Sequence, residues 1–199
     1  LPSMAAEPTG FGRHGYRNLA EKGSSCGVTL SDVLSSQNME KAWKQVKANK
    51  GAAGIDGMKV GDFPDFAKAH WEKVISKLAK GSYSPSPVRS VQIPKGGGKF
   101  RQLGIPTVLD RVIQQAISQV LTPLYEPHFS EHSHGFRPKR SAHGAIEEML
   151  RESNQKGSKC HVVDCDLAAF FDTVNHQKLM GKLRERIADP GLLKLIHGY

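Results

Sequence analysis

A glycine-rich turn between two short apolar stretches limits the possible folds of this chain more than any other feature. Residues 88–93 and 100–105 are rich in apolar side chains, and Lys95-Gly96-Gly97-Gly98-Lys99 lies between them. Two such stretches separated by a few residues with glycine predict a β-hairpin. Because helical patterns flank the hairpin on both sides, the expected fold class is α+β.

The tip of this predicted hairpin is basic, with Lys95, Lys99 and, just inside the second strand, Arg101. Three consecutive glycines allow the backbone to approach a ligand closely. A flexible basic tip suits a triphosphate or the backbone of a nucleic acid. The alternative is an edge hairpin whose lysines only prevent aggregation.

Apolar residues recur at helical spacing outside the hairpin. The spacing predicts helices from residue 38 to about residue 50, over 65–80, over 108–122 and from residue 142 onward. The expected N-terminal caps are Asn38, Thr107 with Asp110, and Ser141, and the expected stops are Gly51, Gly81 and Pro123. The glycines of residues 51–57 follow no strand and lack the Lys-Ser/Thr pair of a phosphate-binding loop, so plain turns are expected there.

An apolar stretch interrupted by aspartates lies at residues 160–167. The pattern predicts a buried strand that ends in a tight turn, with Asp164 and Asp166 on one face. A carboxylate in such a stretch is costly unless a cation or hydrogen-bond donors compensate it. Asp166 at the strand end is a candidate ligand for a hard cation such as Mg²⁺, with the Leu167 carbonyl as a second ligand. The alternatives are a hydrogen-bonded structural Asp166 and, for Asp172, a cap of the next helix.

The charge of the chain points to a polyanionic partner. The formal net charge is +9 and the pI is about 9.5. Between residues 82 and 140, eight basic residues face three acidic ones. This distribution favours nucleic acid, with a solvated basic surface as the alternative.

Cysteines and hydropathy exclude several other classes. Three cysteines are too few for a disulfide scaffold and match no zinc-site spacing, so we expect reduced thiols. Three histidines in the 128–134 loop lack a fourth ligand at zinc spacing. No stretch resembles a membrane span or a secretory signal, which makes a cytoplasmic location the expectation.

Four motifs occur in one order along the chain: GIDG (54–57), YSPSPVRSVQIPKGGGKFRQLGIPTVLDRVIQQAI (83–117), HGFRPKRSAHGAI (134–146) and VVDCDLAAFFDTVNHQKLM (162–180). Together they resemble the reverse transcriptases encoded by bacterial group II introns, from about residue 30 to the C-terminus. The resemblance implies a right-hand polymerase, with helices packed around a basic β-hairpin and a short antiparallel sheet. It implies a flexible leader over 1–30, the fingers over 31–158 and the first part of the palm over 159–199.

The resemblance also implies roles for single residues. Asp166 matches the aspartate that binds both catalytic Mg²⁺ ions, with the Leu167 carbonyl beside it. Phe171 matches the aromatic residue that excludes a ribose 2′-hydroxyl. Lys95 and Arg101 match the fingers residues that hold the incoming deoxynucleoside triphosphate.

The implied partners are an RNA template, intron RNA, a DNA primer and deoxynucleoside triphosphates, and a homodimer is left open. The candidate RNA contacts are Lys99, the basic loop with Arg137, Lys139 and Arg140, and the leading helices of the chain.

The sequence departs from the family pattern in three ways. Gln102 stands where the family has Pro, and His134 stands where it has Tyr. The Tyr-Ala-Asp-Asp turn with the second metal-binding aspartate does not occur in this sequence. The expectation is a fragment that cannot polymerise alone, although its parent does. The alternatives are a non-catalytic RNA-binding module of the maturase type with polymerase architecture, and a related reverse transcriptase outside introns.

Overall fold

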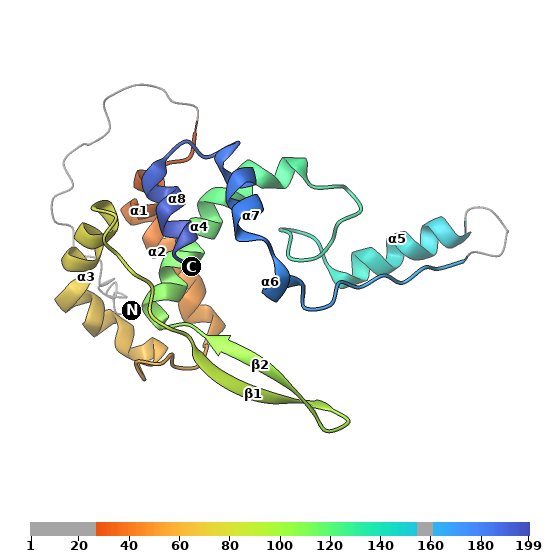
Figure 1. The fold of residues 1–199 in the computed structure, drawn as a ribbon, viewed down its shortest axis with the longest axis horizontal. Helices are drawn as coiled ribbons and strands as arrows, with labels where there is room; N and C mark the ends of the chain where they lie inside the picture. Colours follow the sequence, from red (N-terminus) through yellow and green to blue (C-terminus); the bar gives the residue numbers. More distant parts are fainter. Residues whose placement is uncertain (1–26, 155–160) are drawn as a thin grey trace, which may run out of the picture.

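A computed structural model describes residues 27–154 and 161–199 of the chain (Figure 1). Its elements in chain order are α1 (Leu30–Leu34), α2 (Ser36–Asn49), the 3₁₀ helix η1 (Val60–Asp62), α3 (Phe63–Ala79), β1 (Arg89–Gly96), β2 (Lys99–Ile105), α4 (Val108–Tyr125), the 3₁₀ helix η2 (Glu126–His128), α5 (Ala142–Asn154), α6 (Phe170–Thr173), α7 (His176–Arg184) and α8 (Pro190–His197). The described residues are therefore α+β, with one two-stranded antiparallel sheet.

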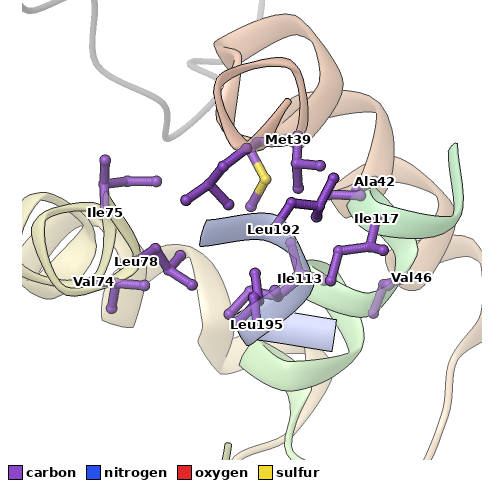
Figure 2. Packing of buried hydrophobic residues seen from close by; sticks show 14 of the residues in the cluster. Met39, Ala42, Val46, Val74, Ile75, Leu78, Ile113, Ile117, Leu192 and Leu195 are labelled. Atoms are coloured by element: carbon purple, nitrogen blue, oxygen red, sulfur yellow. The ribbon is translucent and has the colours of Figure 1, made fainter. Parts of the chain in front are cut away.

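Side chains from α2, α3, α4 and α8 form the hydrophobic core, and Figure 2 shows them pointing toward one centre. They occupy the helical spacing read from the sequence, as in the run from Val112 and Ile113 to Ala116 and Ile117 of α4. Leu192 of α8 is fully buried, so the last helix of the chain belongs to the same core as the first ones.

A buried carboxylate ties two separate parts of the chain, residues 83–86 and Tyr199, to the start of α4. Asp110 is 1% exposed and accepts hydrogen bonds from the hydroxyls of Thr107 (2.6 Å), Tyr83 (2.7 Å) and Tyr199 (3.1 Å) and from the backbone N–H of Ser86 (3.1 Å). Burial and the nearby Asp110 carboxylate raise the pKa of both tyrosines, so both hydroxyls stay protonated and donate. The predicted cap pair of Thr107 and Asp110 is confirmed, and it also joins the C-terminus to the core.

The hairpin projects from the helices as an arm rather than lying among them (Figure 1). None of its residues is buried, with only Val91, Ile93 and Ile105 half-buried. The expectation that helices pack around the hairpin is therefore wrong. Phe100 and Leu103 of the hairpin remain 64% and 40% exposed.

Two predicted helix boundaries are wrong. Asn38 is not a cap but lies inside α2, where its side-chain amide donates to the carbonyls of Val33 (2.9 Å) and Ala116 (3.0 Å). Pro123 lies inside α4 rather than ending it, because one missing N–H near the end of a helix costs only one hydrogen bond. The predicted stop at Gly81, which has φ of +63°, and the Ser141 cap are confirmed.

The predicted buried strand over 160–167 is also wrong. Residues 161–167 are neither helix nor strand, and Val162, Val163 and Leu167 are 70–83% exposed. A strand needs hydrogen-bonding neighbours on its edges, and in the described residues the two strands of the hairpin pair only with each other. Residue 160 itself and residues 1–26, which hold most of the predicted leader, lie outside the described residues. Leu30, the last residue of that leader, begins α1 and is buried.

Candidate functional site

Asp166 lies in an open segment between α5 and α6. Its side chain is exposed, and in the described part of the chain its carboxylate has no hydrogen bond or ion pair. This contradicts the alternative of a hydrogen-bonded structural aspartate. A free carboxylate beside the exposed backbone of Leu167 offers oxygen ligands of the kind that Mg²⁺ prefers.

Phe171 follows in the short helix α6. Ala169, with φ of +49°, turns the chain into this helix, and the Thr173 hydroxyl donates back to the Ala169 carbonyl at 3.0 Å. The rings of Phe170 and Phe171 meet edge to face with centroids 5.4 Å apart. Phe171 remains 81% exposed, so its ring can contact a ligand. Asp172 lies within α6, and Asn175 caps α7 instead, contrary to the alternative for Asp172.

The hairpin holds its three cations near the tip. Arg101 pairs with Ile93, while the pairing shifts between Pro94 and Gly96, so Lys95 is the extra residue of a bulge. Bulges re-aim side chains next to functional sites. Gly96, Gly97 and Gly98 all have positive φ, which explains why only glycine suits this turn. Lys95, Lys99 and Arg101 are all exposed.

The hairpin and the Asp166 segment form separate arms in Figure 1. The structure therefore places the candidate triphosphate contacts and the candidate metal ligand on different projections. In the described residues, no group of three or more His, Cys, Asp or Glu side chains is arranged to hold a metal ion. Asp166 fits a divalent ion as one ligand of a set that other groups would complete.

Arg137, expected as an RNA contact, instead holds its own loop together. Its guanidinium donates to the Glu126 carboxylate (3.0 Å) and to the carbonyls of Ser130 and Ser133, and it lies 5.4 Å from the Phe129 ring centroid. Its side chain is only 9% exposed. These partners lie 4 to 11 positions before Arg137, with no regular spacing, so the sequence does not reveal them.

Lys139 and Arg140 remain at the surface of the same loop. Both are exposed, and Arg140 donates one hydrogen bond to the Glu131 carbonyl (2.8 Å). Lys139 has φ of +61°, a left-handed conformation that is uncommon for residues other than glycine. The exposed positive charge of the loop therefore comes from these two residues.

Two histidines fasten this loop to α5. Glu148 of α5 accepts hydrogen bonds from His132 Nδ1 and from His134 Nε2 (2.6 Å). The bonds to Glu148 raise the pKa of His132 above its usual 6.5, with Glu131 and Glu152 adding to the shift. The same bonds lower the pKa of Glu148 from 4.5 to about 2.

The hydrogen bonds that hold the basic loop to α5 are expected to depend on pH. Because the pKa of His132 is raised in the folded state, its contribution to stability is fully present below about pH 6.5 and is lost as the pH rises through the raised value. Because the pKa of Glu148 is lowered, its contribution is fully present above about pH 4.5. The bonds are therefore strongest between those values. Trypsin cleavage after Lys139 and Arg140, normalised to an unstructured peptide of the same sequence, should be faster at pH 8.5 than at pH 6.

The variant Glu148→Gln is the control, because it removes the carboxylate charge that faces the histidines. Its normalised cleavage rate should not change between the two pH values. An equal pH dependence in Glu148→Gln would contradict this role of the two histidines.

Among the glycines of residues 51–57, Gly54 has a packing role, in agreement with the expected turns. A side chain at Gly54 would lie 2.6 Å from the backbone of Thr107, so the loop abuts the start of α4. Asp56 accepts a hydrogen bond from the backbone N–H of Met58 (3.1 Å), and Gly57 has φ of +72°.

Among the described residues, no helix combines the length and apolar character that a membrane crossing requires.

Comparison with known proteins places these features in one family. The model of the family described as reverse transcriptase (RNA-dependent DNA polymerase) matches residues 93–198, which is more than half of the chain. The match contains the hairpin from Ile93 onward, the basic loop, Asp166 and Phe171.

Several curated proteins share the sequence beyond this region. Protein YkfC of Escherichia coli is 37% identical over 153 residues, which are 75% of this chain and 40% of that protein. The group II intron-encoded protein LtrA of Lactococcus lactis is 36% identical over 159 residues, which are 79% of this chain and 26% of that protein. Nuclear intron maturase 1 of Arabidopsis thaliana is 33% identical over 91 residues, covering 46% and 12%.

The chain thus spans two fifths of the first of these relatives and about a quarter of the second. The resemblance to group II intron-encoded proteins that the four motifs indicated is confirmed, and the chain belongs to the reverse transcriptase family.

Proposed function

We propose that this chain forms the fingers (31–158) and the first part of the palm (159–199) of an RNA-directed DNA polymerase encoded by a group II intron and acting in the cytoplasm. The observation that carries the proposal is the free, exposed Asp166 followed by the exposed ring of Phe171, inside the region that matches the family. We call the protein that joins this chain to the rest of the polymerase the parent polymerase. Its roles include assisting the splicing and mobility of the intron.

Asp166 and the Leu167 carbonyl are proposed to hold Mg²⁺. Two such ions, when bound, activate the 3′-hydroxyl of the primer and neutralise the leaving pyrophosphate. The second shared carboxylate comes from the rest of the parent polymerase. The exposure of residues 162–167 suits the pairing of this segment with further strands there.

Lys95 and Arg101 are proposed to bind the triphosphate of the incoming deoxynucleotide. Both cations are exposed near the glycine tip of the hairpin. Charge that accumulates on the phosphates during transfer is stabilised by positioned cations, which supply much of the catalysis in such reactions. Closing the gap between the two arms is the motion that this proposal requires.

The basic loop and the hairpin are proposed to contact RNA. Lys99, Lys139 and Arg140 are exposed and suit phosphate contacts, which fix position without reading sequence. Arg137 contributes by holding the loop, because its guanidinium is used inside it.

Nucleotide selection in the parent polymerase tests the proposal. Primer extension on an RNA template should require Mg²⁺ and deoxynucleotides, and the 199-residue chain alone should not extend the primer. Phe171→Ala should raise the ratio of ribonucleotide to deoxynucleotide incorporation by at least about tenfold, because it removes the ring that blocks the 2′-hydroxyl.

Phe170→Ala is the matched control, since it removes the neighbouring ring of the same helix. It should leave the ratio nearly unchanged. Equal ratios for the two variants would contradict the assignment of Phe171. A parent polymerase that binds RNA but never extends a primer would favour the non-catalytic maturase-type module.

A further inference from the structure

A groove of about 530 Å³ lies between α4, the basic loop and the helices α7 and α8, and nothing in the proposed site uses it. We call it the α4–α7 groove. Its apolar lining comes from all of these parts, as with Leu121 of α4, Phe129 of the loop, Leu179 of α7 and Ile196 of α8. Phe129 and Leu179 remain 51% and 46% exposed. Contiguous apolar side chains left open in this way mark a surface on which another group docks.

The charged side chains that line the groove already have partners within the described residues. The Glu126 carboxylate lies 2.9 Å from the guanidinium of Arg137, and the ammonium group of Lys182 lies 2.9 Å from the Glu185 carboxylate. The groove therefore presents apolar surface with its charges neutralised. Such a surface suits apolar side chains of a polypeptide better than the phosphates of a nucleic acid.

Phe136 at the edge of the groove is held in an unusual backbone conformation. Its φ is +56°, in the left-handed region that bulky residues rarely adopt, and its side chain is fully exposed. Such a conformation is costly and tends to occur where a residue is held in place for contact with a ligand or partner. An exposed aromatic ring is also the kind of side chain that anchors an interface. Phe136 is thus the candidate anchor of the α4–α7 groove.

The position of Tyr199 indicates what covers the groove. Tyr199, the last residue of the chain, lines the groove, and its hydroxyl donates to the buried Asp110 carboxylate at 3.1 Å. Any polypeptide that follows Tyr199 in the parent polymerase therefore starts at the wall of the groove. The relatives leave ample length for such a polypeptide, since the chain spans 40% of YkfC and 26% of LtrA. A second copy of the chain is a poorer occupant, because each copy carries a net charge of +9.

We propose that an apolar segment of the polypeptide that follows Tyr199 in the parent polymerase covers the α4–α7 groove and packs against Phe136. The proposal rests on the proposed function, because the parent polymerase supplies this segment. The segment contacts both the basic loop and the helices α7 and α8. It thereby fixes Lys139 and Arg140 of the loop relative to the part of the chain that follows Phe171.

A photo-cross-linker in place of Phe136 identifies the occupant. In the Phe136→p-benzoylphenylalanine variant of the parent polymerase, irradiation joins the benzophenone to a C–H group that contacts it. Mass spectrometry should locate the cross-link within the same polypeptide, at apolar residues after Tyr199. The same replacement at Phe100, an exposed phenylalanine of the hairpin that lies outside the groove, is the matched control and should not give this product.

The other outcomes of irradiation overturn the proposal. They are a cross-link from residue 136 to a second copy, a cross-link to added RNA, products confined to residues 1–199, and no product. Primer extension by the unmodified parent polymerase separates the two proposals. Extension without the expected cross-link overturns the assignment of the groove while the proposed function stands, and the cross-link without extension does the reverse.

Thermal unfolding gives an independent test that needs no cross-linker. Phe136→Ala should change the midpoint temperature of the 199-residue chain by less than about 1 °C, because the ring is exposed there. In the parent polymerase the same change should lower the midpoint by at least about 3 °C, because it removes a ring that is covered. Phe100→Ala is the matched control and should leave both midpoints within about 1 °C. Equal shifts for Phe136→Ala in the two proteins would contradict the proposal.

Discussion

Asp166→Ala in the parent polymerase is expected to lower primer extension by at least about a thousandfold while RNA affinity stays within about threefold. The change removes the carboxylate that is proposed to bind the catalytic ions. RNA affinity is expected to persist because the proposed RNA contacts include the hairpin and the basic loop. Steady-state extension and RNA binding measured on the same preparation give both quantities.

The Asp166→Ala change should leave the fold intact, because Asp166 is exposed and has no partner among the described residues. Its replacement should change the free energy of unfolding by no more than about 0.5 kcal/mol. Asp172→Ala is the matched control, as it removes an exposed aspartate from the same region, and it should retain extension. Loss of both extension and RNA binding in Asp166→Ala would indicate a folding role instead.

Asp110→Ala is expected to destabilise the 199-residue chain by about 3–5 kcal/mol. The carboxylate is buried and holds four donors from three separate segments, and alanine would leave them without an acceptor. A loss of this size is a large part of the stability of a small domain. Urea unfolding followed by circular dichroism measures it.

Single donors provide the comparison for Asp110. Tyr199→Phe and Tyr83→Phe each remove one hydroxyl and leave the other donors in place, so each should cost only about 1 kcal/mol. An Asp110→Ala variant no less stable than these two would show that the carboxylate does not organise the start of α4.

Local sequence patterns were sufficient to predict the elements whose structure depends on residues close together in the sequence. The hairpin and the helices later found as α2, α3 and α4 follow from glycine placement and apolar spacing, and Thr107 caps α4 as expected. The prediction failed at Asn38, whose amide bonds the Ala116 carbonyl 78 positions away. No local pattern contains such a partner.

The site was predictable in part for the same reason. Asp166 and Phe171 belong to a compact motif, and the structure leaves both exposed. The strand expected around Asp166 does not form over residues 161–167. Its absence could not be predicted from these residues themselves, because a strand forms only where another strand offers hydrogen-bonding partners. Arg137 looked like a surface cation, yet it is held by Glu126 and by loop carbonyls whose positions only the fold determines.

The central claim, that Asp166 binds a divalent ion, can be tested by locating the ion. Fe²⁺ in place of Mg²⁺, with ascorbate and peroxide, cleaves the polypeptide backbone beside the bound metal. In the parent polymerase with RNA template, primer and deoxynucleotide, we expect cleavage within a few residues of Asp166 that Asp166→Ala abolishes. Cleavage that avoids this segment, or that persists unchanged in Asp166→Ala, would contradict the claim.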